Sequence, residues 1–372
     1  MQQDTNQQVF FELVRAGLWE KKARLSQFKD IDYSTILNLA AEQSLVGLIT
    51  AGLELVIDVK VPQAWVLQFV GETLQIEQRN KDMNAFVARL IETLRKEDVY
   101  ALLVKGQGIA QCYERPLWRS CGDVDLFLSG NNYTKAADFL KTSASSLDEE
   151  DEYNHHLAMT VDSWVVELHG TLRSGLWKRI DRALDDVQRS VFYDGKVRSW
   201  MNGGTQVFIP NADEDVVFVF SHILQHFFKE GIGLRQICDW CRLMWTYKDN
   251  LDVKLLEQRL KAMGVMTEWK AFAALTVNYL GIPAEVMPFY SASGKWLRKA
   301  GKILNFILET GNFGHNRDYS YYKKYPYLVF KSISFWNHFK DTFKHSFIFP
   351  KDAMLVWLGR LDDGIKMIAK GK

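Results

Sequence analysis

The stretch LWRSCGDVDLFLSG, residues 117–130, places two aspartates inside an apolar run that is typical of a buried strand. Alternate residues of a strand point to the same face of a sheet, so Asp123 and Asp125 are expected on one side. Buried carboxylates are costly, and their mutual repulsion raises the pKa of one of them unless a cation neutralises the pair. We therefore predict a divalent cation here, Mg²⁺ or Mn²⁺, since Mg²⁺ typically takes one or two carboxylates plus phosphate oxygens.

A third carboxylate lies on the strand that alternation predicts over residues 164–169, WVVELH. Glu167 and His169 share one face of this strand. If the strand lies beside the one that carries Asp123 and Asp125, three acids meet at one point. That set of side chains suits two-metal phosphoryl or nucleotidyl transfer, with all three acids as metal ligands.

A glycine turn precedes the acidic strand, in LLVKGQG over residues 102–108. Gly106 and Gly108 would let backbone N–H groups approach phosphates closely, and Lys105 could add positive charge. The turn is neither a Walker A motif nor a complete G-x-G-x-x-G, so its value comes from its position before the acids.

Two histidine pairs leave their roles open. His155 and His156 begin the strand that precedes residues 164–169, and His155, with His169, is a candidate for the cleft. A strand-end histidine without function is an equally good interpretation of His155. His222 and His226 have a metal-binding spacing on a helix, but HILQH lacks the glutamate of zinc proteases. A structural or cleft-lining role is favoured for them.

The composition is that of an ordinary globular protein of 372 residues, with 47% hydrophobic and 24% charged residues. The net charge of +1 excludes the global basic excess of many nucleic-acid binders. The first residues do not resemble a signal peptide, and no apolar run is long enough for a membrane span. Four cysteines fit a reducing compartment, and Cys238 and Cys241 in CDWC are expected in the core. A cytoplasmic protein is predicted.

Helical patterns fill the first hundred residues. One covers residues 35–55, and a longer one begins after Pro62 and runs to about Lys96. Helical patterns return after Pro210. The tail from His315 mixes aromatic residues with lysines, and core packing is favoured there over contact with a membrane surface.

Between these helices the pattern is that of a small sheet. Apolar runs at 99–106 and 123–130 predict buried strands, the second closed by a Gly-Asn-Asn turn before a helix over 133–143. Hairpins are expected around Asp162–Ser163 and Gly203–Gly204. The predicted class is α+β, with N-terminal helices over 1–96, a mixed β-sheet domain over 97–210 and a C-terminal helical domain over 211–372.

The motifs between residues 99 and 170 resemble those of a bacterial family of uncharacterised nucleotidyltransferases within the DNA polymerase β-like superfamily. The chain supplies Lys-Gly, Tyr-x-x-Pro-x-x-Arg, Asp-x-Asp and Glu-x-His, through Lys105, Gly106, Tyr113, Pro116, Arg119, Asp123, Asp125, Glu167 and His169. The resemblance implies a small mixed sheet with flanking helices. It also implies attack of an acceptor on the α-phosphate of a nucleoside triphosphate (NTP) such as ATP, which releases pyrophosphate.

Carried over, the resemblance assigns roles to single residues. Asp123 and Asp125 would hold the metals, and Glu167 would complete the site or act as a base toward the acceptor. Gly106 would face the triphosphate. Superfamily members usually have Gly-Ser at this turn, whereas this chain has Gly106–Gln107, so a phosphate-binding hydroxyl is missing. Lys105 or Arg119 would compensate for it.

Three functions follow from these observations. The first is metal-dependent nucleotidyl transfer to an unknown acceptor, for which the neutral charge favours a small molecule or protein side chain over a long nucleic acid. The second is a non-catalytic descendant that binds a nucleotide or a partner, which the Gly-Gln departure favours. The third is a plain interaction protein in which the acids are incidental.

Overall fold

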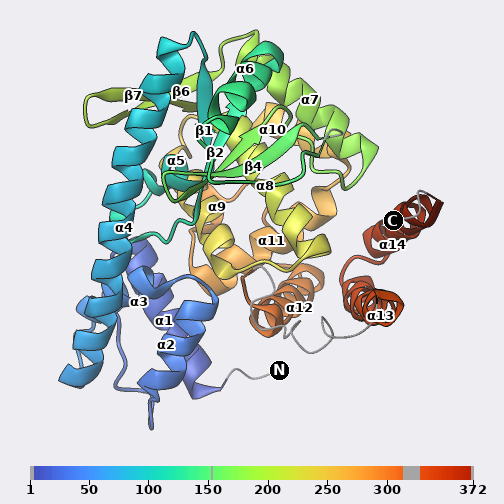
Figure 1. The fold of residues 1–372 in the computed structure, drawn as a ribbon. Coiled ribbons are helices and arrows are strands. Elements are labelled where there is room, and N and C mark those ends of the chain that lie inside the picture. The colour runs from blue at the N-terminus through green and yellow to red at the C-terminus, as the bar shows by residue number, and fades with distance from the viewer. Residues whose placement is uncertain (1–3, 152–153, 313–326, 370–372) are drawn as a thin grey trace.

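The computed structural model describes residues 4–151, 154–312 and 327–369. Four helices precede the sheet, and α4 begins after Pro62 as predicted and runs along one side of the molecule (Figure 1). The pattern over 35–55 forms two helices, because Ser44 interrupts it with a left-handed backbone of φ +55°. The bounds are α1 Thr5–Trp19, α2 Tyr33–Glu42, α3 Val46–Glu54 and α4 Gln63–Lys96.

A seven-stranded mixed sheet follows, in the order β3-β4-β5-β2-β1-β7-β6. β2 pairs with β1 in antiparallel and with β5 in parallel, and this register sets Asp125 opposite both Val104 and Glu167. The two predicted hairpins, β4–β5 and β6–β7, are confirmed. The strands are β1 Ala101–Val104, β2 Asp123–Leu128, β3 Ser146–Leu147, β4 His156–Val161, β5 Trp164–His169, β6 Val197–Asn202 and β7 Thr205–Pro210.

Helices connect these strands. The predicted Gly-Asn-Asn turn is wrong, because Gly130 already belongs to the first turn of the helix that follows β2. Another connecting helix, α7, was not expected from the sequence. The bounds are α5 Gly106–Ala110, the 3₁₀ turn η1 Pro116–Trp118, α6 Gly130–Lys141 and α7 Lys178–Phe192.

The two faces of β2 meet different cores. Val124, Leu126 and Leu128 point to one face, where they pack with apolar residues of α4 and α6. Phe127 points to the other face and joins a larger core built mostly from helices. Because Asp125 shares the face of Phe127, its carboxyl points toward these helices and away from α6.

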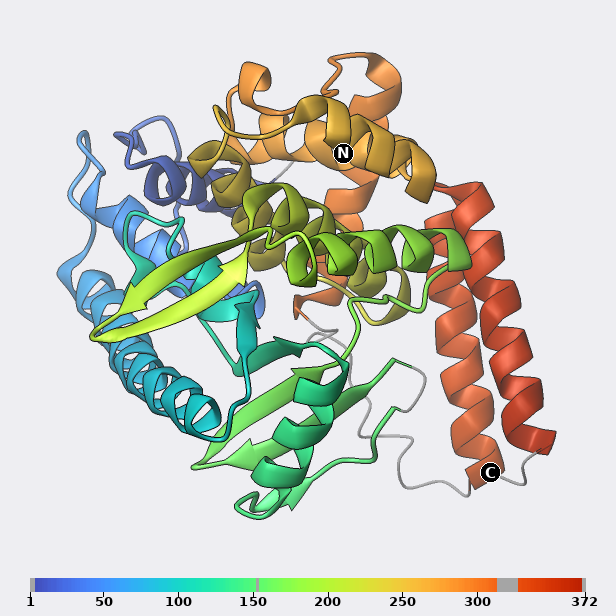
Figure 2. The ribbon, with the colours of Figure 1, turned by 90° about the horizontal axis from the view of Figure 1, so that it is seen from above.

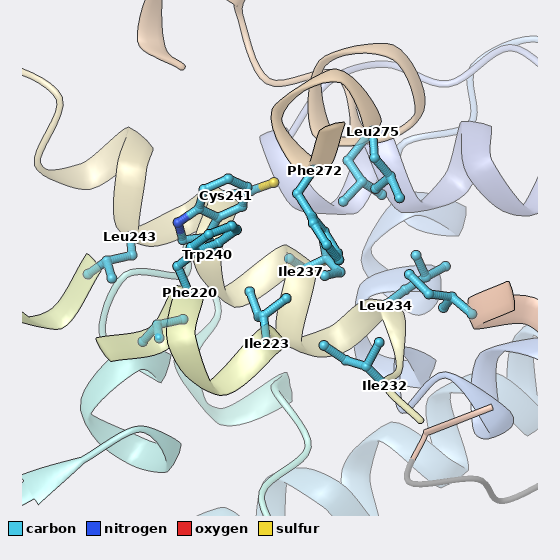
Figure 3. Close-up of a cluster of buried hydrophobic side chains, with 14 of the residues drawn as sticks. Phe220, Ile223, Ile232, Leu234, Ile237, Trp240, Cys241, Leu243, Phe272 and Leu275 are labelled. Carbon is cyan, nitrogen blue, oxygen red and sulfur yellow. The ribbon is translucent and has the colours of Figure 1, made fainter. Parts of the chain in front are cut away.

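The larger core lies mainly among the C-terminal helices. Phe220 and Ile223 of α8 pack with Ile237 and Trp240 of α9 and with Phe272 of α11 (Figure 3). Cys238 and Cys241 are also fully buried, which confirms that they are core residues. These helices are α8 Ala212–Lys229, α9 Leu234–Thr246, α10 Val253–Met263, α11 Met266–Leu275 with a π-helical turn over Thr276–Leu280, α12 Gly294–Thr310, α13 Tyr327–Ser346 and α14 Pro350–Ala369.

The N-terminal helices share this core. Buried residues of α1, α2 and α3 belong to the same apolar cluster as those of α8 to α12. Hydrogen bonds also join the N-terminal helices to those that follow the sheet: the Leu234 N–H donates to Oε1 of Gln43, and the Trp19 indole donates to the Leu280 carbonyl. The sheet is therefore held between α4 and α6 on one face and a single helical body on the other.

The aromatic tail is partly described. Its residues 315–326 lie outside the described residues, while α13 and α14 lie side by side (Figure 2). His345 and Phe349 pack against Phe227 of α8, so core packing is confirmed for this part. Trp336 and Phe343 of α13 are instead more than half exposed. In the described ranges, the structure has no helix that is both long and apolar enough to cross a membrane.

Candidate functional site

The turn between β1 and α5 brings a lysine to the acidic strand. Lys105 and Gly106 both have positive φ angles, +56° and +35°, so the chain bends sharply here. A Cβ at Gly106 would lie 3.6 Å from the Asp123 carbonyl oxygen, which shows how closely this turn approaches β2. Nζ of Lys105 lies 2.6 Å from Oδ1 of Asp125. Lys105 therefore reaches the acids directly.

The two aspartates of β2 differ in their surroundings. Asp125 is buried, and its Oδ1 lies close both to Lys105 and to Nε2 of His169, at 2.8 Å. Asp123 is half-buried and has no ion pair within the part of the chain that the structure describes. The charge of Asp125, and then burial, raise the pKa of Asp123, while Lys105 opposes this shift. The aspartate pair thus retains like-charge repulsion that a cation would relieve.

Glu167 is held by two histidines. Its Oε2 lies 3.2 Å from Nε2 of His156 and 3.5 Å from Nε2 of His169. Burial alone would raise the pKa of Glu167, but these two hydrogen bonds and the charge of Lys105 more than offset it and lower the pKa. Burial likewise would lower the pKa of His169, yet its bonds to Asp125 and Glu167 raise it. The group is a network of alternating charges on one face of the sheet.

The same group contains potential metal ligands of a second kind. One ligand atom each from His156, Glu167 and His169 lies within 4.8 Å of the other two. The site therefore offers carboxylate oxygens at Asp123 and Asp125 and a mixed nitrogen and oxygen set beside them.

A cavity of about 400 Å³ lies above this face of the sheet. It is bounded on one side by the turn after β1 and by β2, β4 and β5, and on the other by α8. The sheet side contributes Lys105, Asp123, His156, Glu167 and His169, and α8 contributes Ser221, His222, Gln225 and His226. A second cavity of about 50 Å³ involves Gly106, Arg119, Asp125 and Arg235, and it shares Lys105, Asp123 and His222 with the first.

Two residues that the sequence suggested for phosphate binding have partners of their own within the protein. The Gln107 side chain is buried against α4, where its Nε2 donates to Oδ1 of Asn80, so it does not line either cavity. Arg119 forms a bidentate ion pair with Asp239 of α9, at 2.8 and 2.6 Å. Its side chain is 3% exposed, so this ion pair is buried.

The histidine that lines the cavity is His156, the neighbour of the predicted His155. His155 is exposed, packs edge-on against Tyr133 and does not line the cavity. His156 takes that place. It lies on the same face of β4 as Ala158, and Ala158 pairs with Glu167 of β5. The two histidines are adjacent, and the sequence pattern does not show at which of them β4 begins.

Two further contributors come from helices. Arg235 of α9 lines the small cavity with Asp123 and Gly106, and its Nη1 lies 3.8 Å from Asp239. His222 of α8 lines both cavities, which confirms the cleft-lining interpretation of HILQH. No local motif marks Arg235, since only the packing of α9 against α5 brings it to the acids.

A model of the uncharacterised nucleotidyltransferase family matches residues 29–281, which is more than half of the chain. The protein belongs to this nucleotidyltransferase family. No curated protein and no solved structure matches the chain.

The match to the nucleotidyltransferase family covers every residue of the site. It begins before α2 and ends just after the π-helical turn, so it includes the sheet, α8 and Arg235 of α9. Helices α1 and α12 to α14 lie outside it. The predicted family and α+β class are thereby confirmed.

Proposed function

We propose that this protein is a metal-dependent nucleotidyltransferase that moves a nucleoside monophosphate from an NTP to an acceptor. The observation that carries the proposal is the convergence of Asp123, Asp125 and Glu167 with Lys105 on one face of the sheet, where two adjoining cavities share Lys105 and Asp123. Carboxylates for a metal and a cation for phosphates are the groups that phosphoryl transfer requires, since its catalysis is mostly positioning and charge stabilisation.

The donor set fits a divalent cation such as Mg²⁺ or Mn²⁺. Asp123 and Asp125 supply two carboxylates, and the charge of Asp125 raises the pKa of Asp123, a repulsion that a bound cation would relieve. They would hold the ion, with Glu167 as the third acid. A bound cation would polarise the α-phosphate and offset the charge that develops on it.

The chain's own cations would bind the triphosphate. Lys105 stands at the glycine turn, and Arg235 faces the same small cavity from α9. Gly106 gives the backbone close approach there, although the missing hydroxyl leaves more of the phosphate binding to these two cations. Arg119 already has a bidentate carboxylate partner, so we assign it to positioning α9.

The size of the cavity bears on the kind of acceptor. A cavity of about 400 Å³ falls in the usual range of small-ligand sites, roughly 300–1,000 Å³. This favours a small molecule or a single protein side chain over a long nucleic acid.

One observation favours the alternative of a non-catalytic nucleotide-binding protein. Oδ1 of Asp125 is occupied by both Lys105 and His169, so the acid is already neutralised without a metal. In that case nucleotide binding would persist without turnover.

Titration of the full-length protein with ATP, GTP, CTP and UTP, with and without Mg²⁺ or Mn²⁺, tests the proposal. Metal-dependent binding and pyrophosphate release are expected, and both should be lost in Asp123→Asn. Asp138→Asn, an exposed change on α6, is the matched control and should behave like the wild type. Metal-dependent binding without release against broad acceptor pools would favour the alternative, and no nucleotide binding at all would overturn both.

A further inference from the structure

Two histidines of α8 form a bonded pair on the wall of the cavity opposite the acids. Nε2 of His222 lies 3.0 Å from Nε2 of His226, and the two rings are nearly perpendicular, at 85°. Nδ1 of His226 lies 3.0 Å from Oε2 of Glu230, which follows α8. The three side chains form a chain that runs from a partly exposed carboxylate to the place where both cavities meet.

This chain of contacts fixes where the protons are. Glu230 is ionised at neutral pH, because the hydrogen bond from His226 lowers its pKa more than burial raises it. A carboxylate only accepts, so His226 carries a proton on Nδ1, and in the neutral ring the lone pair is on Nε2. The His222 ring must then donate its Nε2–H to His226. Its Nδ1 is left with a lone pair.

His222 is suited to hold that lone pair at neutral pH. Burial first, and then the positive charges of Lys105 and His169, keep the pKa of His222 well below the ordinary value, although Glu167 acts in the other direction. Arg235 also faces the small cavity that His222 lines. A neutral imidazole here is therefore ready to accept a proton and is surrounded by groups that bind phosphate and carboxylate.

We propose that Nδ1 of His222 is the general base that deprotonates the acceptor, and that His226 and Glu230 position it in this tautomer. The inference rests on the proposed nucleotidyl transfer. The acceptor O–H gives its proton to Nδ1 of His222 while its oxygen forms a bond to the α-phosphorus. The bond from the α-phosphorus to the bridging oxygen of the β-phosphate breaks, and pyrophosphate leaves with that electron pair. The imidazolium returns its proton to water after pyrophosphate has left.

The assignment separates two roles that Glu167 would otherwise combine. Glu167 is bonded to His156 and His169, which lower its pKa, so it is a weak base and a good ligand for a cation. His222 stands on a different element and has a free lone pair by the argument above. The acid wall would thus hold the metal and nucleotide, and α8 would activate the acceptor.

The tautomer can be measured on the protein alone. Nitrogen-15 NMR of histidine-labelled full-length protein should show His222 protonated on Nε2 and His226 on Nδ1 at pH 7.5. Glu230→Gln should weaken this preference. His338→Gln, which removes a histidine of α13 that lines neither cavity, should leave both signals unchanged. A His222 ring protonated on Nδ1 would overturn the inference whatever the protein's turnover.

Kinetics supply the second test, with Mn²⁺-ATP labelled on the α-phosphate and a cell extract as the acceptor source. His222→Ala should lower kcat by about 10²- to 10⁴-fold, the usual contribution of a general base, and leave ATP binding unchanged. Added imidazole should restore part of the rate. Wild-type turnover with an unimpaired His222→Ala variant would overturn the inference alone, whereas absent metal-dependent ATP binding by the wild type would overturn the proposed function instead.

Discussion

Lys105 and Asp125 form a buried ion pair at the point where β1 ends beside β2, with Nζ 2.6 Å from Oδ1. The two side chains are 14% and 3% exposed. The lysine was predicted to bind phosphate and the aspartate to bind metal, yet each is the other's partner. Arrival of a cation at Asp125 would weaken its hold on Lys105 and free the ammonium for phosphate. Metal and nucleotide binding are thereby expected to be coupled.

Asp125→Asn is expected to lower the free energy of unfolding by about 3 kcal/mol or more, because it leaves Lys105 as a buried charge without its partner. The double variant with Lys105→Met should recover part of that loss, since both charges are then gone. Urea unfolding monitored by circular dichroism measures both effects. A double variant less stable than Asp125→Asn would contradict this view of the pair.

Arg119→Lys is expected to lower stability by a similar amount while leaving nucleotide affinity nearly unchanged. A lysine cannot reproduce the two parallel bonds to Asp239, which also accepts a hydrogen bond from Tyr113. Unfolding by urea and isothermal titration with Mg²⁺-ATP separate the two effects. A stable variant with weakened ATP binding would instead assign Arg119 to the phosphates.

Arg235→Ala should show the opposite behaviour. Its guanidinium lines the small cavity beside Asp123, and we expect ATP to bind roughly tenfold more weakly, or about 1.4 kcal/mol. Stability should change little, because its contact with Asp239 at 3.8 Å is loose. Arg182→Ala, an exposed change on α7, is the control. Equal ATP affinity in the two variants would exclude Arg235 from the nucleotide site.

Glu268→Gln is expected to remove a pH dependence of stability. Burial, and then the hydrogen bond and charge of Asp352, raise the pKa of Glu268 to about 9. Between its ordinary value of 4.5 and about 9, the folded protein keeps a proton that the unfolded chain releases. Stability therefore falls as pH rises, by at most about 1.4 kcal/mol per pH unit from this group.

The variant has no such group, so its stability relative to the wild type should increase from pH 5 to pH 8. Urea unfolding at several pH values measures this difference. A constant difference across that range would show that Glu268 has an ordinary pKa in the folded protein.

Gly52→Ala tests how closely α1 and α3 approach. A Cβ at Gly52 would lie 2.2 Å from the Leu13 carbonyl oxygen, so the helices must separate, at a cost of about 1–3 kcal/mol. Gly71→Ala on α4 is the matched comparison, because a Cβ there meets nothing within 4 Å. It should stabilise the protein by about 0.5–1 kcal/mol through helix propensity. Thermal unfolding of both variants is sufficient, and equal shifts would contradict the close packing.

The local elements of the site could be predicted from the sequence. Strand alternation and glycine turns correctly gave β2, β5 and both hairpins, because these signals involve residues close in sequence. The shared face of Glu167 and His169 followed from the same rule. Helix α7 was not predicted, although Ile180, Leu184, Val187 and Val191 repeat at helical spacing between the two hairpins.

Contacts between residues that are far apart in the sequence could not be predicted from it. Arg119 meets Asp239, 120 residues away, and Gln107 meets Asn80 of α4. Such pairs depend on how whole helices pack, which no local spacing encodes. For the same reason no local signal marks Arg235, whose neighbours near the acids come from the turn after β1 and from β2.

Helix α1 has a consequence for how this family can be studied. It precedes the family match, yet its Gly17 lies so close to α3 that a Cβ would be 2.0 Å from the Leu48 carbonyl oxygen. Trp19 also donates to the Leu280 carbonyl at the far end of the match. A fragment trimmed to residues 29–281 would expose the apolar side of α3 and is expected to aggregate. The segment that the family model matches is therefore shorter than the segment that folds as one unit. The protein should be expressed with α1 included.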